Sequence, residues 1–415
     1  MCNHLATYRS CAATAGYRPG PAASSGASED IGVLMRCRGA IIREAPGKYE
    51  IVDLDVDDPR QNELRIRLVA AGLCHSDDHV ATGDLPVGTY PFAVGHEGAG
   101  IVEAVGPNTT SFSPGDKVVF SFLPSCGKCR WCATGHQNLC DLGANSLLGS
   151  RADDPTSFRL HLSDGTPVGQ MAGVSAFCEF TTVSVHSAVK VPDDTDLTEA
   201  CLLGCCVGTG WGAAVNTGGV RPGDTVIVIG VGGVGSNAVQ GAVHAGALHV
   251  IAVDPVLFKR DNAFQFGATH AVETTSEAAQ LAREFTNGQG ADVAILTVGV
   301  LEGAHLAKAF AAVRKRGVVV VAAVGDVRPS GVPLPLGELT LYEKQIRGSL
   351  FGSCSPHADI PRLLELYRAH KLNLSDLVTT TYRLDDVARG FEDMHAGTNI
   401  RGVVVFDDTH AGAGR

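Results

Sequence analysis

The chain has 415 residues, of which 45% are hydrophobic and 19% are charged, so it can bury the cores of two folded domains. Its formal net charge of -11 argues against nucleic acid or another polyanion as a partner. The longest apolar runs, such as Val318 to Val324, are far too short for a membrane span. The chain contains 13 Cys and no secretion signal, which indicates free or metal-bound thiols and a cytoplasmic location.

Residues 1–34 show no periodicity, and most of Cys11 to Ser28 consists of Ala, Ser, Gly and Pro. The stretch has no apolar core of a signal peptide, so we predict a disordered tail, with a transit peptide as the alternative. Met35 directly precedes a strand-like run. Translation that starts at Met35, with the first 34 residues a mis-assigned extension, is therefore a further hypothesis.

Residues 35–206 are predicted to form a β-rich domain, because short alternating runs are separated by Gly and Pro. The expected strands are Cys37–Arg43, Tyr49–Leu54, Leu64–Ala71, Gly100–Val105, Lys117–Phe122 and Phe180–Val185.

From residue 207 to 350 the pattern changes to strands that alternate with helices, which predicts a doubly wound α/β sheet. The expected strands are Thr225–Ile229, His249–Val253, Thr269–Val272, Ala291–Leu296, Gly317–Ala323 and Ile346–Leu350. Helices are expected at Gly233–Ala245, Leu257–Phe266 and Gly303–Arg314. Residues 351–415 add two helices, Ile360–His370 and Asp385–Ala396, and a strand, Gly402–Phe406. This tail does not extend the series, so we expect it to return to the first domain.

The segment Gly72 to Val80 gathers a thiol, a hydroxyl, two carboxylates and two imidazoles within a few residues. Thiolate and imidazole are ligands that zinc prefers, and a hydroxyl beside a metal can pass a proton. His96, in Gly95-His-Glu-Gly98, is a candidate second ligand for Cys74, with Glu97 as an outer or exchanging one. A third ligand is expected near the domain junction, where Cys205 and Cys206 are equal candidates on their chemistry alone.

Four further cysteines follow a tight spacing, which predicts a separate structural zinc site: Cys126, Cys129, Cys132 and Cys140. Four thiolates can surround one tetrahedral zinc and leave no open position for a substrate. A disulfide-rich loop and an iron–sulfur cluster are the alternatives, and both are less favoured in a reduced β-rich loop.

A glycine-rich turn predicts a dinucleotide site, because it follows an expected strand and opens an expected helix. Its residues are Gly230, Gly232, Gly233, Val234 and Gly235. Asp254 ends the next strand, where a carboxylate can bind the adenosine ribose hydroxyls and would repel a 2′-phosphate. The pattern therefore favours NAD over NADP.

These motifs together resemble the zinc-containing medium-chain alcohol dehydrogenases from Met35 onward. The matching stretches are Cys74-His-Ser-Asp-Asp-His79, Gly95-His-Glu97, the four-cysteine lobe at 126–140, Gly204-Cys205-x-x-x-Thr209-Gly210, and the glycine-rich turn with Asp254. The resemblance implies a GroES-like catalytic domain over 35–206, an NAD-binding Rossmann domain over 207–350, and a return of 351–415 to the catalytic domain. It places Cys205 at the ligand position, with Cys206 where the family usually has Gly.

The resemblance also implies a mechanism. Cys74, His96 and Cys205 would hold a zinc that receives the alcohol oxygen and lowers the hydroxyl pKa. Ser76 would take the proton and relay it through the nicotinamide ribose hydroxyl to His79 and solvent. Hydride would pass to the nicotinamide. Asp77 would fix the tautomer of His96.

Further roles follow from the same resemblance. His75 and Arg401 would contact the pyrophosphate, Lys259 the adenosine ribose, and Thr209 the cofactor. The substrate pocket would include Phe122, Met171 and Leu350, with Ala172 where bulkier residues can occur. Such an apolar lining favours primary alcohols with alkyl or aryl tails.

Within the family, the chain looks most like the NDMA-dependent nicotinoprotein branch, named after the artificial acceptor N,N-dimethyl-4-nitrosoaniline. Thr82-Gly-Asp-Leu-Pro86, Ser121-Phe-x-Pro-Ser125, Asn138-Leu-Cys-Asp-Leu-Gly143 and Arg347-Gly-x-Leu-Phe-Gly352 carry this likeness. Such enzymes hold NAD(H) tightly and recycle it in place with an external electron acceptor. A homo-oligomer without membrane or nucleic-acid partners is expected.

Three other hypotheses compete with this one. An S-(hydroxymethyl)mycothiol or glutathione (formaldehyde) dehydrogenase resembles the chain at His75, but it needs acidic residues after the first zinc ligand, where only Asp84 is present. A non-enzymatic NAD- or zinc-binding regulator has no need for Ser76 and His79. A zinc-free quinone reductase would lack Cys74 and the cysteine lobe.

Overall fold

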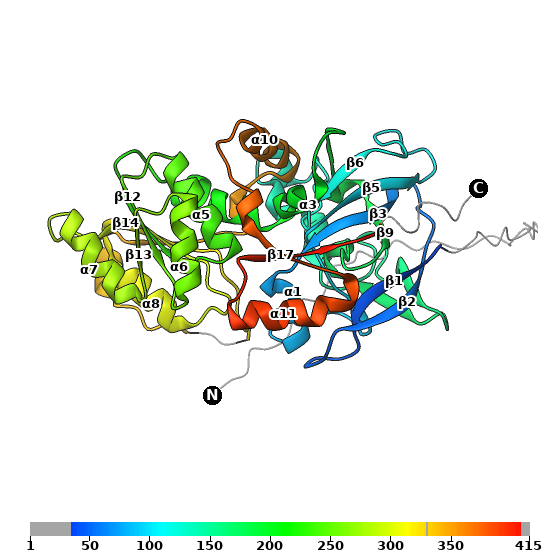
Figure 1. Ribbon diagram of the computed structural model, residues 1–415, viewed down its shortest axis with the longest axis horizontal. Coiled ribbons are helices and arrows are strands. Elements are labelled where there is room, and N and C mark those ends of the chain that lie inside the picture. The colour runs from blue at the N-terminus through cyan, green and yellow to red at the C-terminus, as the bar shows by residue number, and fades with distance from the viewer. Residues whose placement is uncertain (1–34, 329–330, 408–415) are drawn as a thin grey trace, which may run out of the picture. The chain divides into compact units, whose positions relative to one another are not determined.

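The computed structural model describes residues 35–328 and 331–407 (Figure 1). The predictions for residues 1–34 lie outside this range. Within it, the strands form a closed barrel and two larger sheets. The barrel consists of β1 (Met35–Ile42), β2 (Glu50–Val56), β7 (Leu160–Leu162), β8 (Pro167–Gln170) and β4 (Phe92–Ala93).

A second sheet of seven strands is centred on β3 (Glu63–Gly72). Its order is β10 (Ala188–Val191), β6 (Lys117–Phe120), β5 (Gly98–Val105), β3, β18 (Arg401–Val405) and β17 (Val378–Tyr382), and β9 (Phe180–Ser184) also pairs with β3. Val403 of β18 lies opposite Gly72 in antiparallel register. The red C-terminal strand β18 of Figure 1 thus lies beside the blue β3.

The third sheet has six parallel strands in the order β13-β12-β11-β14-β15-β16. They are β13 (His270–Val272), β12 (His249–Val253), β11 (Thr225–Ile229), β14 (Ala291–Leu296), β15 (Val313–Val321) and β16 (Gln345–Gly348). The order runs outward from β11 in both directions, so the predicted doubly wound sheet is confirmed.

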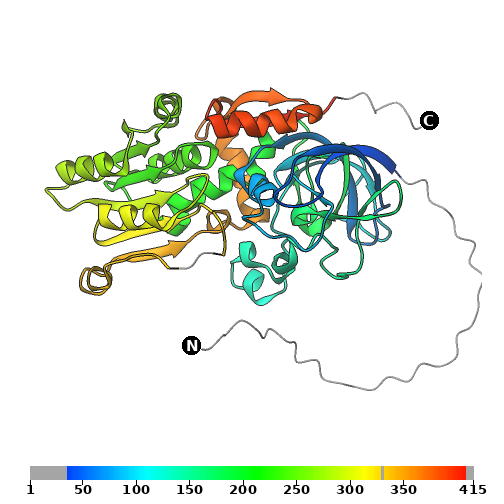
Figure 2. The same cartoon turned by 90° about the horizontal axis from the view of Figure 1, so that it is seen from below.

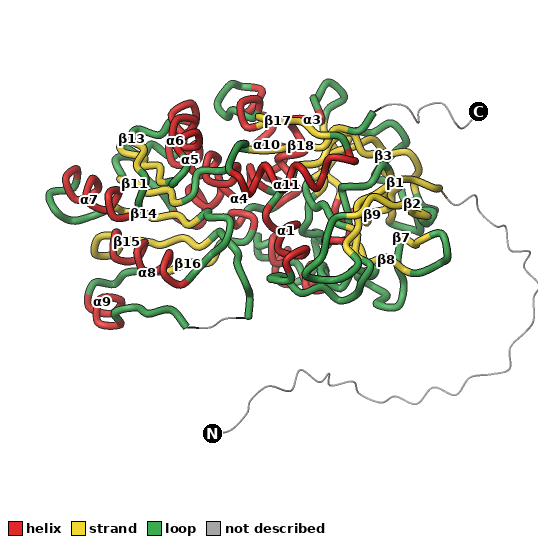
Figure 3. Tube along the Cα trace, turned by 60° about the horizontal axis from the view of Figure 1, so that its bottom comes forward, coloured by secondary structure: helices red, strands yellow, loops and turns green. Residues whose placement is uncertain are grey.

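Alternate side chains of β11 enter two different cores, as period-two geometry requires. Val226 and Val228 pack in the cluster that contains α5 (Gly233–His244) and α6 (Leu257–Ala263). Ile227 and Ile229 pack in the cluster with α7 (Thr275–Phe285) and α8 (Gly303–Ala312). Helices therefore cover both faces of this sheet, which explains its continuous apolar strands (Figure 3).

The remaining helices lie between and beyond the sheets. They are α1 (His75–Thr82), α2 (Arg130–Ala133), α3 (Leu197–Ala200), α4 (Cys206–Gly212), α9 (Leu336–Leu341), α10 (Pro356–Arg368) and α11 (Val387–Ala396). A π-helical turn, Ala213–Gly218, extends α4. No helix in the described ranges is both long and apolar enough to cross a membrane.

The predicted elements differ from the structure mainly at their ends. The helix expected at Gly303–Arg314 stops at Ala312, because Val313 pairs with Ala291 and already belongs to β15. The strand expected at Ile346–Leu350 ends at Gly348. In contrast, the bounds of β11, β12 and β14 match the prediction residue for residue.

Candidate active site

Helix α1 begins directly after the central strand β3 and carries most of the polar cluster. Cys74 precedes the helix with an extended backbone (φ -136°), and Asp77 and Asp78 stand in the first turn, where carboxylates favour a helix N-terminus. Gly83 ends the helix in the left-handed region (φ 83°), which glycine adopts without strain. The local sequence thus places a short helix with its N-terminal residue at the edge of a buried sheet.

Three ligand side chains from separate segments meet at this edge. Cys74 follows β3, His96 lies between β4 and β5, and Cys205 directly precedes α4. Their candidate ligand atoms all lie within 4.8 Å of one another, and all three residues are buried. Cys206 is not in this group, because its Sγ lies 3.7 Å from the carbonyl oxygen of Leu202. The geometry therefore selects Cys205 from the two adjacent cysteines.

Asp77 holds the imidazole of His96 in one orientation. Its Oδ1 accepts hydrogen bonds from His96 Nδ1 (3.0 Å) and from the Gly95 amide (2.9 Å). A proton on Nδ1 leaves the lone pair of Nε2 free, and Nε2 lies 3.4 Å from Cys205 Sγ. The hydrogen bond with Cys205 lowers the pKa of the Cys74 thiol well below its usual range, and His96 lowers it further. A deprotonated thiolate and an oriented imidazole fit a zinc ion with three protein ligands.

Glu97 lies outside the three-ligand group and connects it to β18. Its Oε1 accepts a hydrogen bond from the Cys206 amide (2.7 Å), and its Oε2 forms a buried ion pair with Arg401. Arg401 also lies beside the glycine-rich turn, because a Cβ at Gly233 would collide with its side chain. Arg401 therefore lies between the candidate metal ligands and the candidate nucleotide turn.

The turn after β11 fits a dinucleotide pyrophosphate. Gly230 has a φ of 88°, and the space that a Cβ would occupy at Gly232 is open to 4 Å. The Nε of Arg401 is buried without a hydrogen-bond partner among the described residues. A buried, unpaired guanidinium donor beside an open turn matches the charge of a pyrophosphate. Asp254 Oδ2 accepts the Val231 amide (3.0 Å), so its carboxylate lies next to the same turn.

Other predicted cofactor residues surround this region. The ring of His75 packs against Gly299, and burial lowers the pKa of His75 to about 4. Thr209 Oγ1 lies 3.9 Å from Cys205 Sγ. Lys259 is half-buried on α6, and Val234, on the first turn of α5, packs against the core.

The two predicted proton carriers lie three residues apart on α1, which places them on one face of the helix. Ser76 Oγ lies 3.9 Å from Cys74 Sγ. The side chain of His79 is only 2% exposed. Its Nε2 donates to the carbonyl oxygen of Gly299 (3.0 Å), and its Nδ1 faces Asp84 Oδ2 (3.3 Å). His79 thus needs another group to connect it with solvent.

Aromatic rings cover the ligand group on one side. Phe122 packs edge-on against His96 (5.5 Å between ring centroids) and against Phe351 (5.6 Å). Met171 is buried in an apolar cluster that Phe122 contacts. Leu350 is 45% exposed, whereas the adjacent Phe351, which was not predicted, is the residue whose ring reaches Phe122.

The four cysteines of the lobe form a second candidate metal centre. The sulfur atoms of Cys126, Cys129, Cys132 and Cys140 all lie within 4.8 Å of one another. Backbone amides of Cys126 and Cys129 donate to sulfur atoms of the same group (both 3.3 Å), which favours thiolates. Four sulfur ligands fit a closed tetrahedral zinc site.

Two contacts were not predicted from the sequence: His395 with Asp78, and Asp84 with His79. The first joins residues far apart in the chain, and the second depends on the geometry at the end of a helix. His395 Nε2 lies 2.8 Å from Asp78 Oδ2, so α11 is joined to α1 (Figure 2). The sequence alone assigns no role to Asp78. Asp84 lies just after the helix that carries His79, and this position is a signal in the sequence for the contact between the two side chains.

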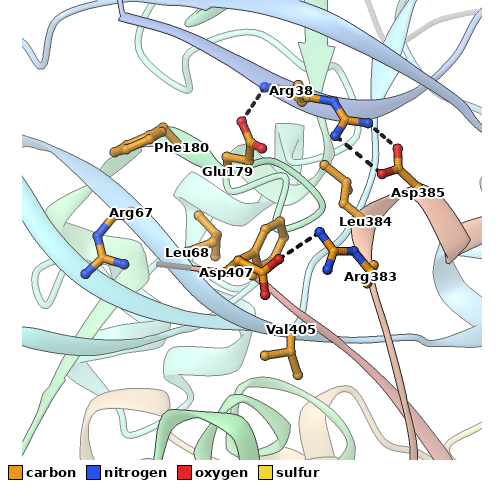
Figure 4. Close-up of a pocket in the computed structure, with 11 residues that line it drawn as sticks. Arg38, Arg67, Leu68, Glu179, Phe180, Arg383, Leu384, Asp385, Val405 and Asp407 are labelled. Atoms are coloured by element: carbon orange, nitrogen blue, oxygen red, sulfur yellow. Dashed lines mark hydrogen bonds and ion pairs between the residues drawn. The ribbon is translucent and has the colours of Figure 1, made fainter. Parts of the chain in front are cut away.

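A hollow of about 170 Å³ elsewhere in the molecule is separate from these sites (Figure 4). Its polar lining is largely paired internally: Arg38 with Asp385, and Arg383 with Asp407 (2.7 Å). None of its lining residues belongs to the metal or nucleotide groups.

Comparison with known proteins agrees with this geometry. Two family models match the chain: "Alcohol dehydrogenase GroES-like domain" over residues 60–193 and "Zinc-binding dehydrogenase" over residues 233–369. The NDMA-dependent alcohol dehydrogenase of Amycolatopsis methanolica is 49% identical over 371 residues, which cover 89% of this chain and 99% of the relative. Alcohol dehydrogenase B of Mycobacterium tuberculosis is 46% identical over 374 residues, with 90% and 99% covered.

Solved structures show the same likeness. An alcohol dehydrogenase zinc-binding domain protein from Burkholderia ambifaria has a TM-score of 0.83 and 32% identity, covering 90% of this chain and 100% of its own. Benzyl alcohol dehydrogenase from Acinetobacter calcoaceticus has a TM-score of 0.82 and 29% identity with the same coverage. The chain has a three-ligand group and a doubly wound sheet, and it matches its relatives almost end to end. It therefore belongs to the zinc-containing medium-chain alcohol dehydrogenases and is similar to an NDMA-dependent member of that family.

Proposed function

We propose that the chain is a two-zinc, NAD(H)-retaining alcohol dehydrogenase that oxidises primary alkyl or aryl alcohols to aldehydes. The observation that carries the proposal is that the candidate ligand atoms of Cys74, His96 and Cys205 lie within 4.8 Å of one another, while Arg401 contacts both Glu97, the neighbour of His96, and Gly233 of the glycine-rich turn. Retention of the nucleotide rests on the 49% identity to the NDMA-dependent relative and on shared motifs.

Each metal group would hold one zinc. Cys74, His96 and Cys205 would bind the catalytic ion and leave a position for substrate, whereas the four-cysteine lobe would bind a structural one. Bound zinc supplies Lewis-acid activation of the alcohol hydroxyl. Asp77 keeps His96 in the ligating tautomer through the 3.0 Å hydrogen bond. Glu97 stays paired with Arg401 and supports the ligand group from outside.

The nucleotide would lie along the turn at Gly230 to Gly235. Arg401 and His75 would bind the pyrophosphate, and Asp254 and Lys259 would bind the adenosine ribose. The Asp254 carboxylate favours NAD over NADP, because it would repel a 2′-phosphate. Bound nicotinamide accepts the hydride.

Residues of α1 would move the proton. Ser76 Oγ takes the proton of the alcohol hydroxyl, and His79, on the same face of α1, is the next group to hold it. Phe122 and Met171 exclude water from the alcohol carbon and favour apolar tails. The structural likeness to a benzyl alcohol dehydrogenase supports aryl alcohols as substrates.

The test is to purify the protein, pass it through gel filtration, and measure bound zinc and nucleotide. We expect two zinc ions per chain, one for each ligand group, and stoichiometric NAD(H). Benzyl alcohol should then be oxidised with NDMA and no added NAD. Loss of the nucleotide, with steady turnover on added NAD, would contradict retention of the nucleotide. The proposed alcohol dehydrogenase activity would still hold.

An assay of the same preparation with formaldehyde tests the alternative function, a thiol-adduct formaldehyde dehydrogenase. Such an enzyme would oxidise formaldehyde only with mycothiol or glutathione present. Asp84, the acidic residue available for thiol recognition, already contacts His79 and Thr82 (3.0 Å from Thr82 Oγ1). We therefore expect no thiol dependence.

A further inference from the structure

We propose that Asp84 is a positioning residue for His79: it holds the ring by Nδ1, stabilises the charge that the ring gains with the relayed proton, and directs that proton to water. The inference rests on the proposed proton path from Ser76 to His79.

The environment of His79 leaves its ring without direct access to solvent. The side chain is 2% exposed, and both ring nitrogens have partners. The carbonyl oxygen of Gly299, 3.0 Å from Nε2, can only accept a hydrogen bond. The carboxylate of Asp84, 3.3 Å from Nδ1, also accepts. An imidazole that lies between two acceptors can donate from both ring nitrogens, so both partners can stabilise the ring once it has gained a proton.

Asp84 is itself held in place from several directions. Thr82 Oγ1 donates to the same Oδ2 atom (3.0 Å), and the Leu85 amide donates to the His79 carbonyl (2.9 Å), which fixes the loop after α1. The amide of Val327 donates to the Asp84 carbonyl oxygen (3.3 Å). These bonds define the orientation of the carboxylate before any substrate binds.

The carboxylate also reaches solvent, which the ring does not. The Asp84 side chain is 26% exposed, so water can approach its carboxylate. In the step we propose, the N–H bond at Nδ1 breaks, its electron pair stays on Nδ1, and the proton forms an O–H bond with a water molecule or solvent base beside Asp84; nothing is oxidised or reduced. The other charged or titratable groups near the pair are His75 (6.5 Å between ring centroids) and Arg328 (3.9 Å from Asp84).

The experiment compares Asp84→Asn with the parent holoenzyme in stopped-flow mixing with alcohol. A pH-indicator dye reports proton release, and absorbance reports reduced nicotinamide. We expect both rates to fall about tenfold in the variant, with KM for the alcohol nearly unchanged, because general acid–base groups contribute about 10²- to 10⁴-fold and only part of that depends on Asp84. Added imidazole should restore much of the lost rate, and Asp84→Glu should regain most of it.

A matched control separates the contact of Asp84 with His79 from its contact with Arg328. Arg328 is 65% exposed, lies 3.9 Å from Asp84 and pairs more closely with Asp326 (2.7 Å). Arg328→Ala should therefore leave both rates unchanged. If Asp84→Asn fails to fold, Thr82→Val, which removes one bond to the same carboxylate oxygen, should still slow proton release measurably while KM holds.

The outcomes for Asp84 and for the proton path itself are distinct. A His79→Gln variant with parental rates would overturn the proposed path. A slow His79→Gln variant together with a folded Asp84→Asn variant of parental rate would overturn the role of Asp84 alone. If the inference is correct, the double variant is no slower than His79→Gln, because Asp84 acts through His79.

Discussion

At the scale of residues, the short segment from Cys74 to Asp84, which contains the eight-residue helix α1, combines different chemical roles. Cys74 joins the ligand group, and Asp77 orients His96. Asp78 binds His395 of α11 instead. Neighbouring carboxylates on one helix thus have different partners, because successive positions on a helix point in directions about 100° apart.

This difference between Asp77 and Asp78 gives a prediction. Asp77→Asn removes the charge behind His96, and we expect zinc to be released about 10- to 100-fold more readily from the three-ligand group. Competition with a chromogenic chelator measures the change. Asp78→Asn is the matched control, since Asp78 contacts His395 and not a ligand. Equal zinc release from both variants would contradict the orienting role of Asp77.

At the scale of elements, β3 connects stability to the site. Its first residue, Glu63, lies in a buried charge network with Arg151 (3.0 Å) and Arg159 (2.7 Å). Its last residue, Gly72, leads into Cys74 and α1. The position of the first ligand therefore depends on a strand that is anchored at its other end.

Glu63→Gln tests this anchor. Burial alone would raise the pKa of Glu63, but Arg159 and Arg151 lower it below its usual range. Because the folded pKa is depressed, the stabilisation is present above the unfolded pKa of about 4.3 and is lost as pH falls through the folded value. Breaking a buried pair costs about 3–5 kcal/mol, so the variant should unfold at lower urea concentration at pH 7. The difference in unfolding free energy between variant and parent should shrink below about pH 4.3. A difference that does not change with pH would contradict the charge argument.

The cysteine lobe is a second element with its own test. Two large apolar side chains of the lobe, Trp131 and Leu139, are 39% and 42% exposed, so they add little to a buried core and a bound metal would supply much of the stability. We expect Cys132→Ser to lose one zinc per chain and to make residues 126–140 sensitive to protease. Zinc at the other group should remain. Loss of both ions in a folded variant would argue against two independent sites.

At the scale of the whole molecule, one edge of the six-stranded sheet suggests self-association. Strand β16 is the last in the order, and nearby Leu336 and Leu341 are 71% and 80% exposed. Unpaired strand edges and grouped apolar side chains favour contact with another chain.

We therefore expect light scattering to give a mass that is a multiple of 43.1 kDa. Leu341→Glu should shift the protein towards a single chain at low concentration, whereas a monomeric parent protein would contradict the proposal. Val243→Glu, on the solvent side of α5 at 43% exposure, is the matched control.

Much of the fold was predictable, because its signals are local. Thr225–Ile229, His249–Val253 and Ala291–Leu296 are continuous apolar runs bounded by turn residues, and the structure has these strands at the same residues. The predicted ends of elements were wrong where strand pairing determines the end. Val313 continues a helical pattern in the sequence, but it pairs with Ala291 in the sheet.

The sequence by itself determined which side chains are available and at what spacing: the eight candidate thiol and imidazole ligands, the glycine-rich turn and the strand that precedes it. Only the tertiary structure decided which of these groups meet. Glu97 pairs with Arg401, and His395 reaches Asp78 across 317 residues of chain. The choice of Cys205 over Cys206, which the family resemblance already implied, agrees with the position of Cys205 beside His96. Spacing along a chain describes neighbours within one helix or strand, whereas contacts between segments depend on how strands register and helices pack. For the same reason, the contact of His79 with Asp84 and Gly299, on which the proposed proton exit depends, appeared only in the folded chain.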